Sequence, residues 1–270
     1  MTRLDDATLA TLLLTSRLVA DGPPPLKARE FWALVARVGG DPATLLTDVP
    51  TDEPDADRVR GLLDRATAFA FALEDVERSG LTLLSAFDGR YPAHLRERLG
   101  DQAPPVLHAA GPVALLSEPA VAVVAERDAG EAASAEARAL ATEVAADGAA
   151  VLTAGTGVGV DAAATEAALE AGGAVIGLLA EALVPQLRRP EARRAIHAGH
   201  LCLVTPYAPT APWSEAAERG RLLIATALAE RTVALDPRPG GLLAIALADA
   251  AARHPEVEVE VVRTDATLDL

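Results

Sequence analysis

Three glycines at alternating positions lie between an apolar stretch and an alanine-rich stretch near the middle of the chain. Residues 151–169 read V-L-T-A-G-T-G-V-G-V-D-A-A-A-T-E-A-A-L, an order that predicts a strand, a tight loop and the first turns of a helix. Glycine has no Cβ, so backbone N–H groups can approach an anion closely, and the next helix adds unpaired donors at its N-terminus. The pattern therefore predicts phosphate binding by the loop residues Thr153, Gly155, Thr156, Gly157, Gly159 and Asp161.

This loop differs from two common phosphate-binding loops. No Lys follows the last glycine, as a Walker A loop requires, and the spacing G-x-G-x-G is not the dinucleotide-binding G-x-G-x-x-G. A tight strand-to-helix turn that binds no ligand is therefore an open alternative. Asp161 has a structural interpretation too, because an acid at a helix start can cap the exposed amides.

Three arginines at the ends of other predicted elements can supply positive charge beside this loop. Arg127 follows a predicted strand, and Arg219 and Arg221 lie near the start of a predicted helix. Guanidinium groups suit phosphate oxygens because they donate two parallel hydrogen bonds. If these segments converge, they form a cationic pocket beside the glycine loop. The alternative is that neighbouring acids neutralise the arginines, namely Glu126, Asp128, Glu215 and Glu218.

A second positive cluster is the densest in the chain and consists of Arg188, Arg189, Arg193 and Arg194 with His197. It could steer a nucleic-acid strand, but an exposed arginine-rich helix face is the commoner explanation and the one we favour.

A catalytic function has little support from the residues. The five histidines form no H-x-x-x-H helical pair, and hydrolysis would need a positioned acid and base or a metal-activated water. Residues 239–241, P-G-G, begin like the P-G-G-x-G-T-x-x-E motif of nucleotide phosphoribohydrolases of the LOG type, but L-L-A follows. We interpret them as a turn before a helix and expect neither enzymatic activity nor a cofactor or metal.

Length and cysteine content set outer limits. The 270 residues suffice for one large domain or two modest ones, and Cys202 is the only cysteine, which excludes an intramolecular disulfide and favours a reducing cytoplasm. The N-terminus M-T-R-L-D-D is acidic where a secretory signal is basic, and no apolar run reaches the roughly 18 residues of a membrane span. We therefore expect a cytoplasmic protein without membrane contact.

The formal net charge of -15, from 24 Lys and Arg against 39 Asp and Glu, counts against a generic polyanion binder. Nucleic-acid-binding domains usually carry a basic surplus, because neutralising phosphates releases counterions. Any nucleic-acid contact of this chain must therefore be local.

Two regions differ in their predicted elements. Residues 1–80 read as a small all-helical module, with helices over about 5–19, 28–38 and 57–78, and Phe31, Trp32 and Val35 as core. A linker over 81–112 follows, and residues 113–270 alternate strands with helices, which predicts an α/β fold with a doubly wound, mostly parallel sheet. The expected strands are 121–125, 149–153, 174–179, 201–205, 232–235 and 257–262, and the expected helices are 132–146, 161–171, 190–198, 214–228 and 242–253.

Several segments occur in the order of a known family. F-D-G-R-Y-P at 87–92 and P-P-V-L at 104–107 begin the series, and V-A-V-V-A-E-R at 121–127 stands in the place of V-A-I-V-G-S-R. Residues 153–161 are similar to S-G-x-A-x-G-I-D, and Trp213 with R-G-R-L-L-I at 219–224 is similar to F-P-x-R-N-R-I-I. Residues 81–235 thus resemble the DNA-processing protein A family, also called DprA or Smf.

The resemblance implies a Rossmann-like fold that binds single-stranded DNA and helps to load a RecA-type recombinase during DNA uptake, acting as a homodimer. The C-terminal winged helix of some members has no counterpart here. Ala125 and Glu126 stand where Gly and Ser are usual, Thr165 lies near a position that is often His, and Gly220 replaces an Asn. Because Glu126 would repel phosphate, the alternative is a protein of the LOG-type fold that has lost DNA binding and binds or hydrolyses a nucleotide-like ligand.

Overall fold

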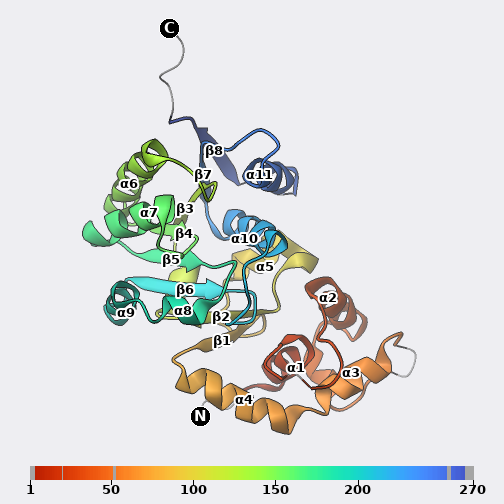
Figure 1. Ribbon diagram of the computed structural model, residues 1–270. Coiled ribbons are helices and arrows are strands. Elements are labelled where there is room, and N and C mark those ends of the chain that lie inside the picture. The colour runs from red at the N-terminus through yellow and green to blue at the C-terminus, as the bar shows by residue number, and fades with distance from the viewer. Residues whose placement is uncertain (1–3, 20, 51–52, 254–256, 265–270) are drawn as a thin grey trace. The chain divides into compact units, whose positions relative to one another are not determined.

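A computed structural model of the chain describes residues 4–19, 21–50, 53–253 and 257–264 (Figure 1). The chain divides into two compact units. The helical unit consists of Met1–Tyr91 and Leu99–His108, and the sheet unit of Pro92–Arg98 and Ala109–Leu270. Of the helices within the described ranges, none is long and apolar enough to cross a membrane.

The helical unit contains an aromatic cluster of Phe31, Trp32 and Phe87. Phe31 and Trp32 have ring centroids 5.1 Å apart, and Trp32 also lies 5.9 Å from Phe87. The indole Nε1 of Trp32 donates to the carbonyl of Ala103 at 2.8 Å, which satisfies the one polar atom of this side chain. With Val35 also buried, the predicted core role of these residues is confirmed. The elements are α1 (Asp6–Thr15), α2 (Ala28–Arg37), α3 (Ala56–Leu63), α4 (Ala66–Arg78), the short 3-10 helices Pro42–Leu46 and Gly100–Gln102, and β1 (Thr82–Ser85) beside β2 (Val106–Ala110).

Two predicted helices of this unit are wrong in extent because of Arg65. The first ends at Thr15, not near 19, and the predicted helix over 57–78 is two helices, α3 and α4, separated at Asp64 and Arg65. The guanidinium of Arg65 turns inward and donates to the carbonyls of Leu13 at 2.6 Å, in the last turn of α1, and of Ser16 at 2.9 Å, which follows that turn. These carbonyls need donors that the helix itself cannot supply, and Arg65 provides them from 49 or more residues away along the chain.

The sheet unit contains six parallel strands in the order β6-β5-β4-β3-β7-β8. Parallel strands buried on both faces read as continuous apolar runs, and all six lie within one residue of the expected ranges at their N-terminal ends. Their bounds are β3 (Ala120–Ala125), β4 (Ala150–Thr153), β5 (Val175–Leu178), β6 (Leu201–Thr205), β7 (Arg231–Leu235) and β8 (Glu258–Val262).

Helices cover both faces of this sheet, so the predicted α/β doubly wound fold is confirmed (Figure 1). Figure 1 shows α6 and α7 together on one side of the strands and α10 and α11 on the other. The strand order reverses between β3 and β7, and in such sheets ligands bind beyond the carboxyl ends of the strands at this reversal. The helices are α5 (Ala93–Leu99), α6 (Glu131–Ala146), α7 (Gly159–Glu170), α8 (Leu183–Gln186), α9 (Pro190–His197), α10 (Glu215–Leu228) and α11 (Leu242–Arg253), with a 3-10 helix at Val113–Ser117.

The segment predicted as a linker, 81–112, contains structured elements. It holds β1, α5 and β2, and it contributes residues to both units. These elements are four to seven residues long, too short for the periodicity of their apolar residues to be recognised.

Candidate nucleic-acid interface

Four of the nine predicted site residues, Arg127, Thr156, Asp161 and Arg221, line a hollow at the carboxyl end of β3. This first hollow is bounded by the end of β3, the glycine loop before α7, and α10, and it encloses about 540 Å³ of space that is partly open to solvent. Half of its lining residues are valine and alanine. The polar side chains among the lining residues are Glu126, Arg127, Thr156, Asp161, Glu218 and Arg221.

The glycine loop separates this hollow from a second one. Thr156 and Val158 line the first hollow, whereas Gly155 and Gly157 line a second hollow between α7 and α9, with Leu201 of β6 in its wall. The φ angles of Gly155 and Gly157 are +71° and +68°, a left-handed backbone that side chains disfavour. Because these two residues are glycines, the backbone of the loop can adopt this conformation and form the wall between the two hollows.

Asp161 satisfies the inner donors of the loop. Its carboxylate accepts from the amides of Gly155 at 3.0 Å and Gly157 at 2.8 Å, and from the hydroxyl of Thr156 at 2.8 Å. Asp161 thus closes the loop that precedes α7, and it does not cap the first amides of that helix. A phosphate could reach the amides of Gly155 and Gly157 only by displacing this carboxylate, because each amide has one hydrogen to donate.

Thr153 and Gly159, at the two ends of the loop, have structural roles in the loop. Thr153 is fully buried, and its hydroxyl lies 3.3 Å from both the amide of Gly155 and the hydroxyl of Thr165. Thr153 therefore supports the loop from inside and does not face the first hollow. Gly159 begins α7 with a φ of +56°.

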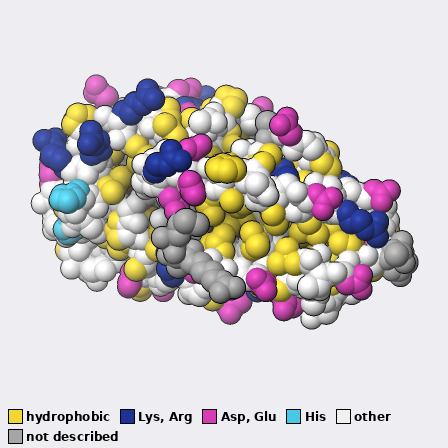
Figure 2. All heavy atoms as spheres, turned by 90° about the horizontal axis from the view of Figure 1, so that it is seen from below, with side chains coloured by type: hydrophobic (Ala, Val, Ile, Leu, Met, Phe, Trp, Pro, Cys, Tyr) yellow, Lys and Arg dark blue, Asp and Glu magenta, His cyan; other side chains and the backbone are white. Residues whose placement is uncertain are grey.

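Arg189 holds the same loop from the side of the second hollow. Its Nη1 donates to the carbonyl of Thr156 at 3.2 Å, and its guanidinium lies where a Cβ on Gly157 would be. The interpretation of the arginine cluster as an exposed helix face is correct for Arg193 and Arg194, which are exposed on α9. Arg188 is also exposed but lies in the turn between α8 and α9, and Arg189 is only partly exposed. Figure 2 shows Lys and Arg side chains gathered beside histidines at its left end, where Figure 1 places α9.

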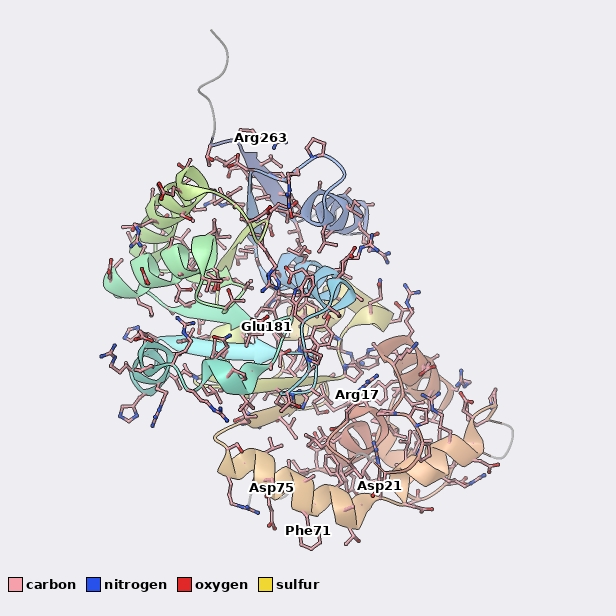
Figure 3. All side chains as sticks on the ribbon, viewed as in Figure 1. Arg17, Asp21, Phe71, Asp75, Glu181 and Arg263 are labelled. Carbon is pink, nitrogen blue, oxygen red and sulfur yellow. The ribbon has the colours of Figure 1, made fainter. Side chains whose placement is uncertain are left out.

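Arg127 lies against an exposed tryptophan at the mouth of the first hollow. The guanidinium carbon of Arg127 is 5.0 Å from the ring centroid of Trp213, and its Nη2 is 3.5 Å from the carboxylate of Glu181, which Figure 3 labels. The side chain of Arg127 is 50% exposed, and Trp213 is 41% exposed. The indole Nε1 of Trp213 lies 3.4 Å from Glu218, at the outer limit of a hydrogen bond. A cation and an aromatic face are thus presented together to solvent.

Arg221 is buried and paired. It is 2% exposed, and its Nε and Nη2 donate to one oxygen of Glu218 at 3.0 and 2.5 Å. Within the described part of the chain, its Nη1 has no hydrogen-bond partner. The predicted neutralisation by a neighbouring acid is confirmed for this arginine.

Arg219 does not line the first hollow, contrary to the expectation that all three arginines converge there. It is exposed, and none of the described residues forms an ion pair with it. Residues two apart on a helix lie about 200° apart around its axis, because each residue turns the helix by about 100°. Arg219 and Arg221 therefore cannot both face the same hollow.

Comparison with known proteins identifies the family. The family model described as DNA recombination-mediator protein A matches residues 82–263, about two thirds of the chain. The chain belongs to the DNA recombination-mediator protein A family. The match begins where the resemblance predicted and continues beyond residue 235 through β8.

Two solved structures of this family are similar in fold. The structure of DNA processing protein A from Streptococcus pneumoniae gives a TM-score of 0.69 at 18% identity, over 99% of this chain and 89% of that one. The protein from Helicobacter pylori, whose structure is described for its single-stranded DNA binding mode, gives 0.52 at 20% identity, over 67% and 80%. A search of curated proteins found no match.

The structure shows what surrounds the three residues that differ from the family motifs, Glu126, Thr165 and Gly220. Glu126 lines the first hollow, and Thr165 lines the second hollow beside Thr153. Gly220 lies against the hydroxyl of Tyr207, which donates to the carbonyl of Ala217 at 2.8 Å. A side chain at position 220 would collide with that hydroxyl. The described residues contain no cluster of three or more His, Cys, Asp or Glu side chains that could hold a metal ion.

The pair of Glu218 and Arg221 makes stability depend on pH. Burial raises the pKa of Glu218, but the attraction of the Arg221 guanidinium and its hydrogen bonds outweigh burial and hold the pKa below its ordinary value of 4.5. A carboxyl with a lowered pKa in the folded state stabilises the fold above its unfolded pKa, and this contribution is lost as pH falls through the folded pKa.

We therefore expect the wild-type protein to lose more stability than the Glu218→Gln variant between about pH 5 and pH 3. Urea unfolding at several pH values measures this difference. Because all other carboxyl groups are shared by the two proteins, parallel pH profiles would show that Glu218 carries no such linkage.

Proposed function

We propose that this protein binds single-stranded DNA across the carboxyl edge of the parallel sheet, with a phosphate on Arg127 and a base on Trp213. The observation that carries the proposal is the exposed pair of Arg127 and Trp213 beside the first hollow. Proteins that bind single strands combine cationic groups with aromatic rings on which bases stack. Membership of the DNA recombination-mediator protein A family and the single-stranded DNA binding mode of the Helicobacter pylori relative support the same function.

The remaining predicted residues have supporting roles in this proposal. The glycine loop, with Thr156 on its inner side, forms the wall of the first hollow, and Arg221 holds α10 in place through Glu218. Arg189 and the exposed Arg188 and Arg193 of the neighbouring segment can continue the phosphate track. Neither Arg188 nor Arg193 forms an ion pair with any carboxylate of the described ranges, so their charge is not neutralised within the chain.

We also propose that the protein acts as a homodimeric accessory factor in the cytoplasm and loads a RecA-type recombinase onto the strand, without enzymatic activity of its own. The description of the family as a recombination mediator supports the loading role. Recombinase ATPase activity on strands coated with single-strand-binding protein measures the loading, and light scattering after gel filtration measures the oligomeric state. No stimulation of the ATPase would contradict the loading role. A monomer at all concentrations would contradict the homodimer.

A titration at two salt concentrations tests the binding function. Release of counterions from several phosphates makes the affinity for an oligonucleotide fall steeply as salt rises, whereas a mononucleotide responds much less. We expect fluorescence anisotropy to show oligonucleotide binding that weakens with salt. Binding of a mononucleotide alone, with weak salt dependence, would contradict the proposal and favour a nucleotide-binding protein of LOG-type fold.

Replacing Arg127 with alanine should weaken oligonucleotide binding about tenfold at low salt, because one charge-assisted phosphate contact and the cation beside Trp213 are lost. Anisotropy titration of the variant measures the change. Arg253→Ala is the matched control, since it removes one partly exposed arginine that pairs with Asp249 on α11. Equal affinities of the two variants would remove Arg127 from the binding site.

A further inference from the structure

Arg238 binds both carboxylates that flank Arg127 in the sequence. Its Nη1 and Nη2 donate to the two oxygens of Asp128 at 3.0 and 2.9 Å, and its Nη2 lies 3.6 Å from Glu126. Arg238 belongs to the turn at 237–241 that follows β7, whereas residues 126–128 follow β3. The two segments therefore meet where the strand order of the sheet reverses.

The same turn also provides space for the side chain of Glu126, beside Gly241. The side chain of Glu126 is 11% exposed, and its Oε1 is buried without a hydrogen-bond partner among the residues that the structure describes. A Cβ built on Gly241 would lie 2.5 Å from this oxygen, so glycine at 241 leaves the space that the carboxyl occupies. The turn itself is closed by a hydrogen bond of 2.9 Å from the Gly241 amide to the Arg238 carbonyl.

This arrangement separates the charges of three consecutive residues. Glu126 and Asp128 are held by Arg238, while Arg127 lies over Trp213 and approaches Glu181. Without Arg238, two uncompensated carboxylates would stand on either side of the cation that is to bind phosphate. Their field would oppose a polyanion, since like charges at short range repel even near a protein surface.

We infer that Arg238 is a positioning residue for DNA binding: it anchors the 126–128 loop so that Arg127 faces Trp213, and it neutralises the acids that flank Arg127. This inference rests on the proposed function and adds that DNA binding by Arg127 requires Arg238 in this chain. The resembled motif has Ser at position 126, and the Glu found here is tolerated because Arg238 compensates it. Arg238 is 61% exposed, so its replacement leaves no buried cavity.

Affinity for an oligonucleotide tests the neutralising role. Arg238→Ala should weaken binding about fivefold at low salt, the upper range for an exposed ion pair, and Arg238→Lys should restore part of the loss by keeping the charge. The triple variant Glu126→Gln, Asp128→Asn, Arg238→Ala should bind about as tightly as the wild type, because no acids remain to be neutralised. Arg253→Ala again controls for the loss of one surface arginine.

Two results would overturn the inference. Unchanged affinity of Arg238→Ala would show that the flanking acids do not matter. A loss that the triple variant fails to restore would show that Arg238 contacts the strand directly and does not act through Glu126 and Asp128.

Tryptophan fluorescence without DNA tests the anchoring role and separates it from the proposed function. Trp213 is exposed and Trp32, the only other tryptophan, is buried, so acrylamide quenching reports mainly Trp213. Release of the 126–128 loop in Arg238→Ala should increase quenching, because Arg127 no longer covers the ring. Unchanged quenching would contradict the anchoring role, whereas a wild-type protein that binds no oligonucleotide would contradict the proposed function alone.

Discussion

Replacing Arg221 with alanine should lower the free energy of unfolding by about 3–5 kcal/mol, the range for breaking a buried ion pair by removing one partner. Arg221 is 2% exposed and provides both guanidinium hydrogen bonds to Glu218. Among the described residues, the variant leaves the largely buried Glu218 carboxylate with the indole of Trp213, at 3.4 Å, as its one side-chain hydrogen-bond donor. Urea unfolding followed by circular dichroism measures the change.

The neighbouring arginine on the same helix provides a matched control. Arg219 is exposed, and its replacement by alanine should change stability by less than about 0.5 kcal/mol. The combination of Arg221→Met and Glu218→Gln should recover much of the loss, because no uncompensated charge then remains buried. Equal unfolding midpoints for Arg219→Ala and Arg221→Ala would contradict the buried pairing described above.

Replacing Gly157 with valine should destabilise the sheet unit by about 2–5 kcal/mol and disable the glycine loop. The φ of Gly157 is +68°, and a left-handed backbone costs a residue with a Cβ about 1–2 kcal/mol. The added side chain must also displace the guanidinium of Arg189, which lies where the Cβ would be, and overpacking of this kind costs a further 1–3 kcal/mol or so. Oligonucleotide affinity should fall with it, because Thr156 and Arg189 lose their arrangement.

Gly172→Val separates the two causes. Gly172 has a similar φ of +77°, but nothing lies within 4 Å of a Cβ built there, so this variant carries the backbone strain without the collision. We expect chemical unfolding to show a larger loss for Gly157→Val than for Gly172→Val, and only Gly157→Val to bind the oligonucleotide less tightly. A Gly157→Val protein that matches Gly172→Val in stability and binding would show that the loop is a plain turn.

The architecture of the sheet unit could be predicted from local patterns. Its buried parallel strands are continuous apolar runs, and helices such as α6 and α11 begin directly after glycines. The helical unit was harder to predict, because the break between α3 and α4 depends on Arg65 reaching carbonyls of α1. A contact over about fifty residues leaves no signal in a window the length of one helix.

The sequence predicted which segments meet at the first hollow, and it predicted their contacts less well. Residue types and order bring Arg127, Arg221 and the glycine loop to one hollow, but they do not show whether Asp161 or a ligand holds the loop amides. The helical period alone could have shown that Arg219 and Arg221 face different ways. The loop contacts of Arg189 and Arg238 were not predicted, because each side chain acts on a loop that is distant in the sequence.

Photo-crosslinking tests the central claim, that a strand lies at the carboxyl edge of the sheet with a base on Trp213. A short oligonucleotide that carries 5-iodouracil at successive positions is irradiated with the full-length protein, and mass spectrometry locates the adduct. The proposed function predicts an adduct on Trp213, which disappears in Trp213→Ala and weakens in Arg127→Ala. Efficient crosslinking to the helical unit alone, with Trp213 unmodified at every position of the probe, would contradict it.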